Sequence, residues 1–317
     1  ALEHRLKPGD EIVVTRMDHD ANVAPWLRLA ADPRVKLRWV DIRPEDATLD
    51  MDSLEAALSH KTKIVATVHA SNAVGTVNPI RHIAGMAHVA GALHVVDAVQ
   101  SAPHVPIDVQ ALGCDFLLCS SYKFYGPHLG ILWGRADLLA SLPVQKVRPQ
   151  KDAAPYRWET GTPPFELIAG LGATFAYLAE IGREAGQADA AQFPGFEGRA
   201  LDLKRAMAAI RQYERGLVTR LIDVLQAFPD IQIYGITEPS RYDERVPTVV
   251  FTHARHSAQD VARHLARRDI YVWDGDYYAP EIMKRLRHAE DGLVRVGLAH
   301  YNTVEEIDRL DAALRSL

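Results

Sequence analysis

The feature that most constrains this chain is an alternation of short apolar runs with amphipathic segments along its first half. The runs are rich in Val and Ile and lie at residues 11–15, 35–42, 63–70, 93–97, 115–121 and 130–134. Between them, residues 79–90 place Ile80, Ile83 and Ala87 at helical spacing. Strands that alternate with helices form a mostly parallel sheet covered by helices on both faces. The sequence therefore predicts an α/β fold for this half.

The pattern changes after residue 150. A Pro-rich loop leads to a predicted helix at 165–181, residues 182–198 are predicted as a loop, and a long helix is predicted at about 200–228. Further strands at 231–235, 248–253, 270–274 and 293–298 alternate with helices at 257–268 and 303–316. A single core stops growing at about 250 to 300 residues. We therefore expect a large domain at 1–198, a bridging helix at 199–228 and a smaller C-terminal α/β domain at 229–317.

Composition excludes several classes of protein. The chain of 317 residues is 48% hydrophobic and 24% charged, with a net charge of -5, which is an ordinary globular composition. No run of like charges could track phosphates, so nucleic acid is not an expected partner. No apolar stretch approaches the roughly 20 residues of a membrane helix, so we expect no membrane association.

The cysteines and histidines exclude further classes. Cys114 and Cys119 share one apolar segment and form neither a disulfide pattern nor a metal-binding pair, which favours a reducing cytoplasm. The 14 histidines show no metal-ligand spacing, so no metal site is expected.

Side chains capable of chemistry follow four of the predicted strands. His19 follows the first, Asn72 the third, Asp97 and Gln100 the fourth, and Lys123 the fifth. Ligands of an open parallel sheet bind at the carboxyl ends of its strands, so these side chains are expected to converge on one edge.

Lys123 is the most reactive of these residues. It closes an apolar strand and precedes a turn, where desolvation disfavours its charged form. A neutral amine forms a Schiff base with an aldehyde, and pyridoxal 5'-phosphate is the cofactor that uses this reaction. The ring nitrogen of that cofactor requires a carboxylate, which Asp97 could supply. The alternative is a structural ion pair with Asp97 or Asp115, and a lysine and an aspartate alone favour that alternative.

A second alternative comes from the S-x-x-K signature of serine acyl enzymes. Ser120 would be its nucleophile and Lys123 its base. That motif requires a helix to align both side chains, whereas Gly126 and Pro127 follow the lysine closely, and the SDN and KTG motifs are absent. A serine acyl hydrolase is therefore a remote alternative.

Taken in order, several segments resemble one known family. They are MDHDANVAPW, HASNAVGT, VDAVQSAPHVPIDVQALGCDFLLCSSYKFYGPHLGILWGR, WETGTPP and LVRVGLAHYNTVEEIDRL. Together they resemble the class V aminotransferases, which are fold type I pyridoxal-phosphate enzymes, and most of all the cysteine desulfurase-like proteins. The resemblance covers essentially the whole chain. It implies a mostly parallel sheet flanked by helices, a smaller C-terminal α/β domain, pyridoxal 5'-phosphate as cofactor and an amino acid as substrate.

The resemblance also implies roles for the strand-end residues. Lys123 would hold the cofactor as a Schiff base and move the α-proton of the substrate. Asp97 would pair with the pyridine nitrogen, Gln100 would bind the ring hydroxyl, and His19 would stack on the ring. Asn72 would lie near the cofactor and the substrate carboxylate.

Four further residues receive roles in the same way. Ser120 and Tyr122 would bind the phosphate, although desulfurases commonly carry histidine at the position of Tyr122. Thr162 would reach the phosphate of a neighbouring subunit, which implies a homodimer with a shared active site. Arg295 would bind the substrate carboxylate through two parallel hydrogen bonds, a geometry that lysine does not offer. The less favoured alternative for Arg295 is a solvent-facing arginine of a strand.

Two departures from the family limit these expectations. The loop that carries the desulfurase nucleophile matches residues 273–283, which offer Tyr277 and Tyr278 but no thiol. Cys114 and Cys119 resemble core cysteines, so persulfide formation is not expected. The family also has a phosphate-cradling turn in a segment that precedes the part matching this chain. The large domain is therefore expected to be incomplete at its N-terminus as numbered here.

The expected reaction is C–S lyase or aminotransferase chemistry at the α-carbon of an amino acid. Racemisation or epimerisation ranks lower, because it needs a second base for which Tyr277 or Tyr278 would have to serve. A catalytically impaired remnant is the non-enzymatic alternative.

Overall fold

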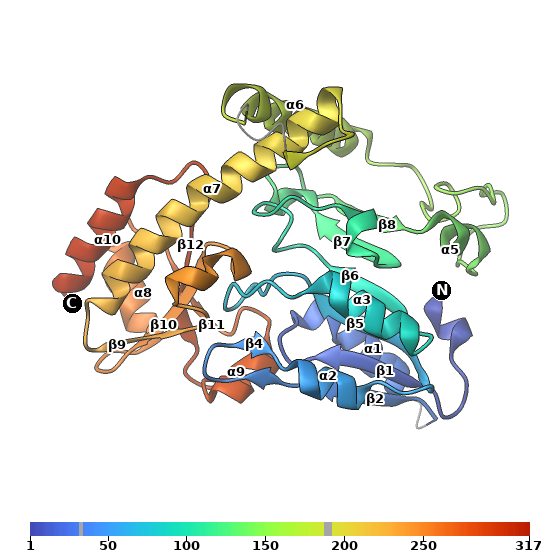
Figure 1. Ribbon diagram of the computed structural model, residues 1–317, viewed down its shortest axis with the longest axis horizontal. Helices are drawn as coiled ribbons and strands as arrows, with labels where there is room; N and C mark the ends of the chain where they lie inside the picture. Colours follow the sequence, from blue (N-terminus) through green and yellow to red (C-terminus); the bar gives the residue numbers. More distant parts are fainter. Residues whose placement is uncertain (32–33, 187–191) are drawn as a thin grey trace.

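The computed structural model describes residues 1–31, 34–186 and 192–317. Its largest element is a six-stranded sheet in the order β2-β1-β5-β6-β7-β8 (Figure 1). The strands are β1 (Glu11–Thr15), β2 (Lys36–Val40), β5 (Thr62–Val68), β6 (Leu93–Asp97), β7 (Phe116–Ser120) and β8 (Gly130–Gly134). Neighbouring strands are parallel except β8, which runs antiparallel to β7. The predicted mostly parallel sheet is therefore present.

Helices cover both faces of this sheet. Ile12 and Ile64 belong to one apolar cluster, whereas their neighbours Val13 and Val65 belong to another. Successive side chains of a strand point to opposite faces, so each central strand contributes to two cores. The covering helices are α1 (Ala24–Ala30), α2 (Met51–Ala57), α3 (Ile80–Val89), α4 (Val109–Leu112) and α5 (Ala136–Ser141). Short elements are the hairpin of β3 (Ile42–Arg43) and β4 (Thr48–Leu49) and the 3-10 turns η1 (Leu2–Arg5), η2 (Asp20–Asn22) and η3 (Ser121–Lys123).

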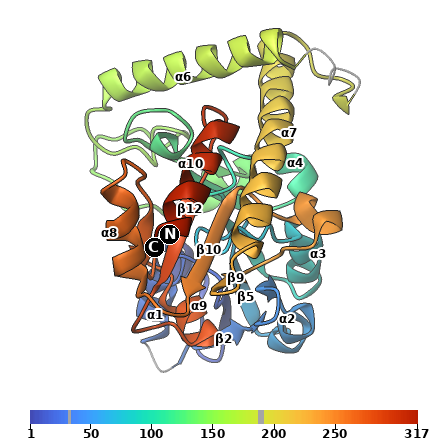
Figure 2. The same cartoon turned by 90° about the vertical axis from the view of Figure 1, so that its left-hand side faces the viewer.

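Two long helices link the large sheet to the rest of the chain (Figures 1 and 2). They are α6 (Phe165–Glu184) and α7 (Gly198–Gln226), close to the two predicted helices. Gly182 lets them approach closely, because a Cβ at this position would overlap the backbone of Asp202. Of the predicted loop at 182–198, residues 187–191 lie outside the described residues.

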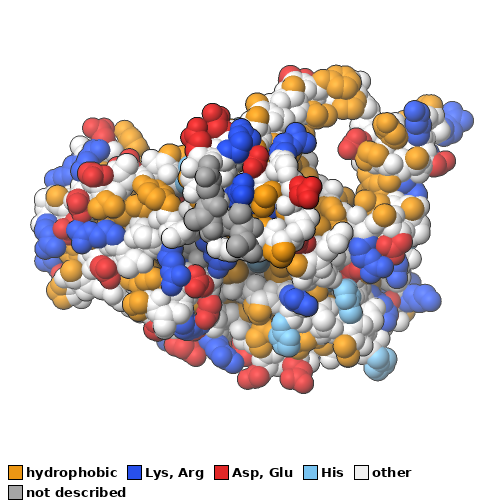
Figure 3. Space-filling view, turned by 45° about the horizontal axis from the view of Figure 1, so that its top comes forward, with side chains coloured by type: hydrophobic (Ala, Val, Ile, Leu, Met, Phe, Trp, Pro, Cys, Tyr) orange, Lys and Arg blue, Asp and Glu red, His pale blue; other side chains and the backbone are white. Residues whose placement is uncertain are grey.

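Helix α6 corrects one expectation. It has 20 residues and a mean hydropathy of 1.3, so by length and composition alone it could cross a membrane. Sequence analysis missed it because charged residues interrupt its ends. Only 22% of its apolar stretch is buried, and Phe165, Ile168 and Tyr177 are exposed. Hydrophobic side chains along the upper edge of the molecule are visible in Figure 3. A single helix of this kind is weak evidence for a membrane span.

The C-terminal part forms a four-stranded antiparallel sheet in the order β11-β12-β10-β9. Leu217, Leu221 and Leu225 of α7 pack in the same apolar cluster as Phe251 and Val294 of this sheet. The bridging helix therefore supplies part of the core of the smaller unit. Its strands are β9 (Ile231–Tyr234), β10 (Thr248–His253), β11 (Trp273–Gly275) and β12 (Leu293–Gly297), and its helices are η5 (Pro239–Glu244), α8 (Ala258–Ala266), α9 (Pro280–Leu286) and α10 (Val304–Arg315).

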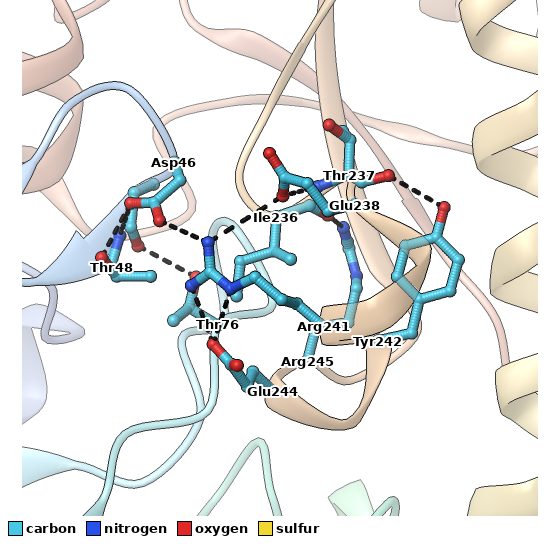
Figure 4. Close-up of polar contacts among 11 residues, drawn as sticks. Asp46, Thr48, Thr76, Ile236, Thr237, Glu238, Arg241, Tyr242, Glu244 and Arg245 are labelled. Atoms are coloured by element: carbon cyan, nitrogen blue, oxygen red, sulfur yellow. Dashed lines mark hydrogen bonds and ion pairs between the residues drawn. The ribbon is translucent and has the colours of Figure 1, made fainter.

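A polar network joins this smaller unit to the β3–β4 turn (Figure 4). Arg241 donates to Asp46 at 2.8 Å and, through two nitrogens, to Glu244 at 3.1 and 2.8 Å. The adjacent Arg245 is 4% exposed and donates from all three guanidinium nitrogens to backbone carbonyl oxygens, those of Ile236, Val246 and Thr248. We call this network of Asp46, Arg241, Glu244 and Arg245 the Arg241 junction.

Candidate active site

The sheet topology brings the predicted strand-end residues together. Strands β1, β5, β6 and β7 are neighbours and run parallel, so the residues that follow them lie on one edge. The charges of Asp97 and Lys123 both influence the pKa of His19, which reports their proximity. His19, Asp97 and Lys123 therefore lie at the same edge of the sheet.

Lys123 ends the short η3 turn after β7, and its side chain is exposed on one side. Burial, and to a smaller extent the charge of Arg295, lowers the pKa of its amine. Within the described part of the chain it forms no ion pair, and its amine lies 5.5 Å from the ring centre of Tyr122. Asp115 instead pairs with Arg135 at 3.1 Å and with His88 at 2.9 Å. The alternative of a structural ion pair for Lys123 is therefore wrong.

Asp97, the last residue of β6, is a buried carboxyl group near Lys123. It is 7% exposed, and one of its oxygens accepts a hydrogen bond from the backbone of Val99 at 2.8 Å. Burial raises the pKa of Asp97, while the nearby His19 lowers it. A buried carboxylate of this kind is stabilised by a cationic partner.

His19 is held in a defined tautomer by its own backbone. Its Nδ1 accepts a hydrogen bond from the backbone of Ala21 at 3.0 Å, so the neutral ring carries its proton on Nε2. Burial lowers the pKa of His19, which favours this neutral form. Its ring stacks against Tyr278, with centroids 5.7 Å apart.

Three of the remaining predicted residues lie around Lys123. Gln100 and Tyr122 line the same cavity of about 350 Å³ as Lys123. The amide of Gln100 donates to Thr248 of the smaller sheet at 3.0 Å, and Tyr122 stacks on His128. Ser120 ends β7, whereas Lys123 ends a 3-10 turn, so the two side chains do not share the face of an α-helix that the S-x-x-K alternative requires. Thr162 is exposed in the loop before α6.

Arg295 meets the large sheet through Asn72, which is 223 residues away in sequence. Its Nη1 donates to the backbone oxygen of Asn72 at 2.7 Å, and its guanidinium lies 4.5 Å from the ring centre of Tyr277. The Asn72 amide donates to the backbone oxygen of Tyr277 at 2.8 Å. Arg295 is thus not the solvent-facing arginine that the strand alone would allow. We call Asn72, Tyr277, Tyr278 and Arg295 the Arg295 site.

Two groups at the Arg295 site are left unsatisfied. The side-chain oxygen of Asn72 is buried and has no hydrogen-bond partner among the described residues. Nε and Nη2 of Arg295 likewise make no hydrogen bond within the described ranges, and together they offer the two parallel donors that a carboxylate needs. The site therefore has the donors and the acceptor to bind a polar ligand.

The two tyrosines of the loop differ in a way that sequence could not show. Tyr277 is 5% exposed, and its hydroxyl donates to the backbone oxygen of Leu293, so it cannot act as a base. Tyr278 is 69% exposed. Both cysteines lie elsewhere, Cys114 just before β7 and Cys119 within it, and burial raises the pKa of both thiols to about 11.

These residues fit pyridoxal 5'-phosphate. Lys123 is an amine with a lowered pKa and has no ionic partner among the described residues, Asp97 is a buried carboxyl, and His19 offers a neutral ring face. This set matches the aldehyde, the pyridine nitrogen and the aromatic plane of the cofactor.

A mostly parallel sheet with this lysine, carboxyl and imidazole at its strand ends defines a pyridoxal-phosphate-dependent enzyme of fold type I. Within that class the chain belongs to the class V aminotransferase family, because the sequence model "Aminotransferase class-V" matches residues 1–195 and 197–310.

Comparison with individual proteins agrees with this family. The chain is 35% identical to a cysteine desulfurase of Cronobacter sakazakii over 325 residues, which is 98% of this chain and 72% of the relative. It is 34% identical to a cysteine desulfurase of Serratia proteamaculans over 99% of this chain and 72% of that protein. Its fold matches the apo structure of a cysteine desulfurase from Thermococcus onnurineus NA1 with a TM-score of 0.84 at 28% identity, covering 99% of this chain and 74% of the other.

Proposed function

We propose that this pyridoxal-phosphate enzyme acts at the α-carbon of an amino acid by C–S elimination or transamination, and that it does not form a cysteine persulfide. One observation carries the proposal: the loop beside Arg295 presents Tyr278, and both thiols lie elsewhere with a pKa of about 11. A thiol rather than a thiolate is a poor nucleophile, so neither cysteine suits attack on a substrate sulfur.

The bound cofactor supplies an electron sink for the charge that develops at the α-carbon. In our proposal Arg295 binds the substrate carboxylate through Nε and Nη2, and Asn72 supports it. The lowered pKa of Lys123 leaves more of its amine neutral, so that the amine can take and return the α-proton. Asp97 would pair with the pyridine nitrogen and keep it protonated, and His19 would lie against the ring.

Several finer assignments belong to the same proposal. Gln100 would bind the ring hydroxyl, and Ser120 and Tyr122 would bind the phosphate. Thr162, which is exposed, would reach the phosphate bound by a second subunit of a homodimer. The enzyme would act in the cytoplasm. The two separate sheets and α7 between them support a division into 1–198, 199–228 and 229–317.

Product analysis tests the proposed reaction. Protein loaded with cofactor is incubated with a panel of amino acids, and pyruvate, keto acid, sulfide and loss of chirality are measured in parallel. We expect pyruvate or keto acid. Sulfide released together with alanine from L-cysteine would contradict the proposal, and loss of chirality alone would favour racemisation.

A second experiment tests the role of Lys123. The wild-type protein should show the visible absorbance band of covalently bound cofactor, and Lys123→Ala should lose it. Arg135→Ala is a suitable control, because Arg135 pairs with Asp115 away from the site. A wild-type protein that stays colourless at saturating cofactor would support the impaired remnant instead.

A further inference from the structure

Two large aromatic side chains near Arg295 are left uncovered, and the proposed function gives neither ring a contact with the substrate. Trp273 is 61% exposed and Tyr278 is 69% exposed. Exposed aromatic surface is unfavourable in water, and where it gathers around a polar anchor it marks a binding site. Ligand sites combine apolar walls with a few well-placed polar groups.

The sheet register fixes the place of Trp273. Its Cα lies directly opposite that of Arg295 in the β11–β12 ladder. Residues paired in this way in an antiparallel sheet project from the same face. The indole and the guanidinium therefore project from the same face of the sheet, whereas the next residue, Asp274, projects from the other face.

The backbone fixes the place of Tyr278. Tyr277 and Tyr278 have φ values of 57° and 56°, in the left-handed region that is unfavourable for bulky residues. The turn is held by the hydrogen bond from Asn72 to Tyr277 and by one from the backbone of Asp20 to the carbonyl of Tyr278 at 2.7 Å. Strain of this kind persists where the surroundings enforce it, commonly at ligand sites. Its result is a phenol ring presented next to His19.

We propose that Trp273 and Tyr278 form the side-chain pocket of the substrate and select amino acids with an aromatic side chain. This inference rests on the proposed function, since it takes Arg295 to bind the α-carboxylate. With the carboxylate fixed there, the substrate side chain extends along a wall that carries two rings. Aromatic rings pack on one another through offset-stacked and edge-to-face contacts that aliphatic side chains cannot make.

Both proposed reactions have substrates in this class. An aminotransferase would take L-phenylalanine or L-tryptophan, and a C–S lyase would take an S-aryl-L-cysteine. Selection by the two rings therefore does not depend on which of the two reactions the enzyme performs.

Binding measurements on the cofactor-loaded protein test the inference. L-phenylalanine, S-phenyl-L-cysteine, L-leucine and L-alanine are titrated while the cofactor absorbance is followed, and calorimetry gives a second value of Kd. We expect the two aromatic amino acids to bind at least about tenfold more tightly than alanine and several-fold more tightly than leucine. Equal affinity for phenylalanine and alanine, or for phenylalanine and leucine, would overturn the proposal.

Substitutions of the two aromatic residues test whether they cause the preference for aromatic amino acids. Trp273→Ala and Tyr278→Ala should each remove most of the preference, measured as the ratio of the Kd of alanine to the Kd of phenylalanine, while Trp273→Phe should retain much of it. Tyr271→Ala is the matched control, because Tyr271 is 80% exposed but lines a separate cavity beside α10. The three side chains changed in these four variants are all exposed in the native protein, and an unchanged thermal midpoint verifies folding. A preference that survives both alanine variants would refute the assignment of the pocket.

Different results would contradict the aromatic side-chain pocket and the proposed reaction. Alanine and sulfide as products from L-cysteine contradict the proposed reaction, whatever the affinities are. The expected products without a preference for aromatic side chains contradict the pocket alone.

Discussion

The Arg241 junction and the Arg295 site connect the same two parts of the chain, but they differ in how completely their polar groups are paired. At the Arg241 junction, all three nitrogens of Arg241 and all three of Arg245 donate to a carboxylate or a carbonyl. At the Arg295 site, one nitrogen of Arg295 donates, and the buried oxygen of Asn72 has no partner among the described residues. We infer that the Arg241 junction, whose polar groups are all hydrogen-bonded, stabilises the fold. The Arg295 site, whose polar groups are only partly hydrogen-bonded, can bind a ligand.

The largest effect is expected at the Arg241 junction. Arg245→Met removes one hydrogen-bond donor from each of three carbonyl groups, and we expect the free energy of unfolding to fall by about 3 kcal/mol. Urea denaturation measures this loss. The Kd of a bound amino acid should hardly change, because Arg245 does not face the Arg295 site. If Arg245→Met weakened amino-acid binding and left the free energy of unfolding unchanged, the proposed difference between the Arg241 junction and the Arg295 site would be wrong.

The reverse outcome is expected for Arg295. Arg295→Lys cannot form two parallel hydrogen bonds to a carboxylate, so amino-acid binding should weaken by about 2 kcal/mol, or roughly 30-fold. The free energy of unfolding should change much less. Arg241→Lys is the matched control at the other contact, where stability should fall and the Kd should not. Calorimetric titration and urea denaturation of both variants make the comparison directly.

The smallest effect concerns the dependence of stability on pH. Burial alone raises the pKa of Asp46, but hydrogen bonds from Arg241 and Thr48 outweigh it and hold the pKa below its ordinary value. The stabilisation is therefore complete above the unfolded-state pKa of about 3.9 and is lost as the pH falls through the lower folded-state pKa. Asp46→Asn should lower the free energy of unfolding, measured by urea denaturation, by about 1 kcal/mol at pH 6 and by progressively less below pH 4. If Asp46→Asn lowers the free energy of unfolding equally at acidic and neutral pH, the stabilisation by Asp46 does not depend on its charge.

Much of the large sheet could be predicted from the sequence, because β1, β5 and β6 are buried on both faces and appear as continuous apolar runs. The edge of that sheet could be predicted too, since parallel strands place His19, Asp97 and Lys123 together. The likeness to a family, and not the residue spacing, suggested that Arg295 binds substrate. The contact between Arg295 and Asn72 depends on how two sheets pack, which no local pattern encodes.

Other features had no signal in the sequence. Residues 241–245 alternate charges as a solvated surface turn does, yet Arg245 is buried. Tyr277 and Tyr278 are adjacent and identical in type, and only the left-handed turn buries one and presents the other. The membrane-length stretch of α6 is not evident in the sequence, because Glu166 and Glu180 interrupt its apolar run.

The acidity of the two cysteines also determines how this protein can be labelled. With a pKa of about 11, Cys114 and Cys119 should react slowly with maleimides at neutral pH. The two native cysteines should therefore be labelled little when a reporter group is attached to an introduced cysteine. In the variant Tyr278→Cys, a fluorophore would attach at one exposed position, and its emission would follow the arrival of substrates without removal of either native thiol.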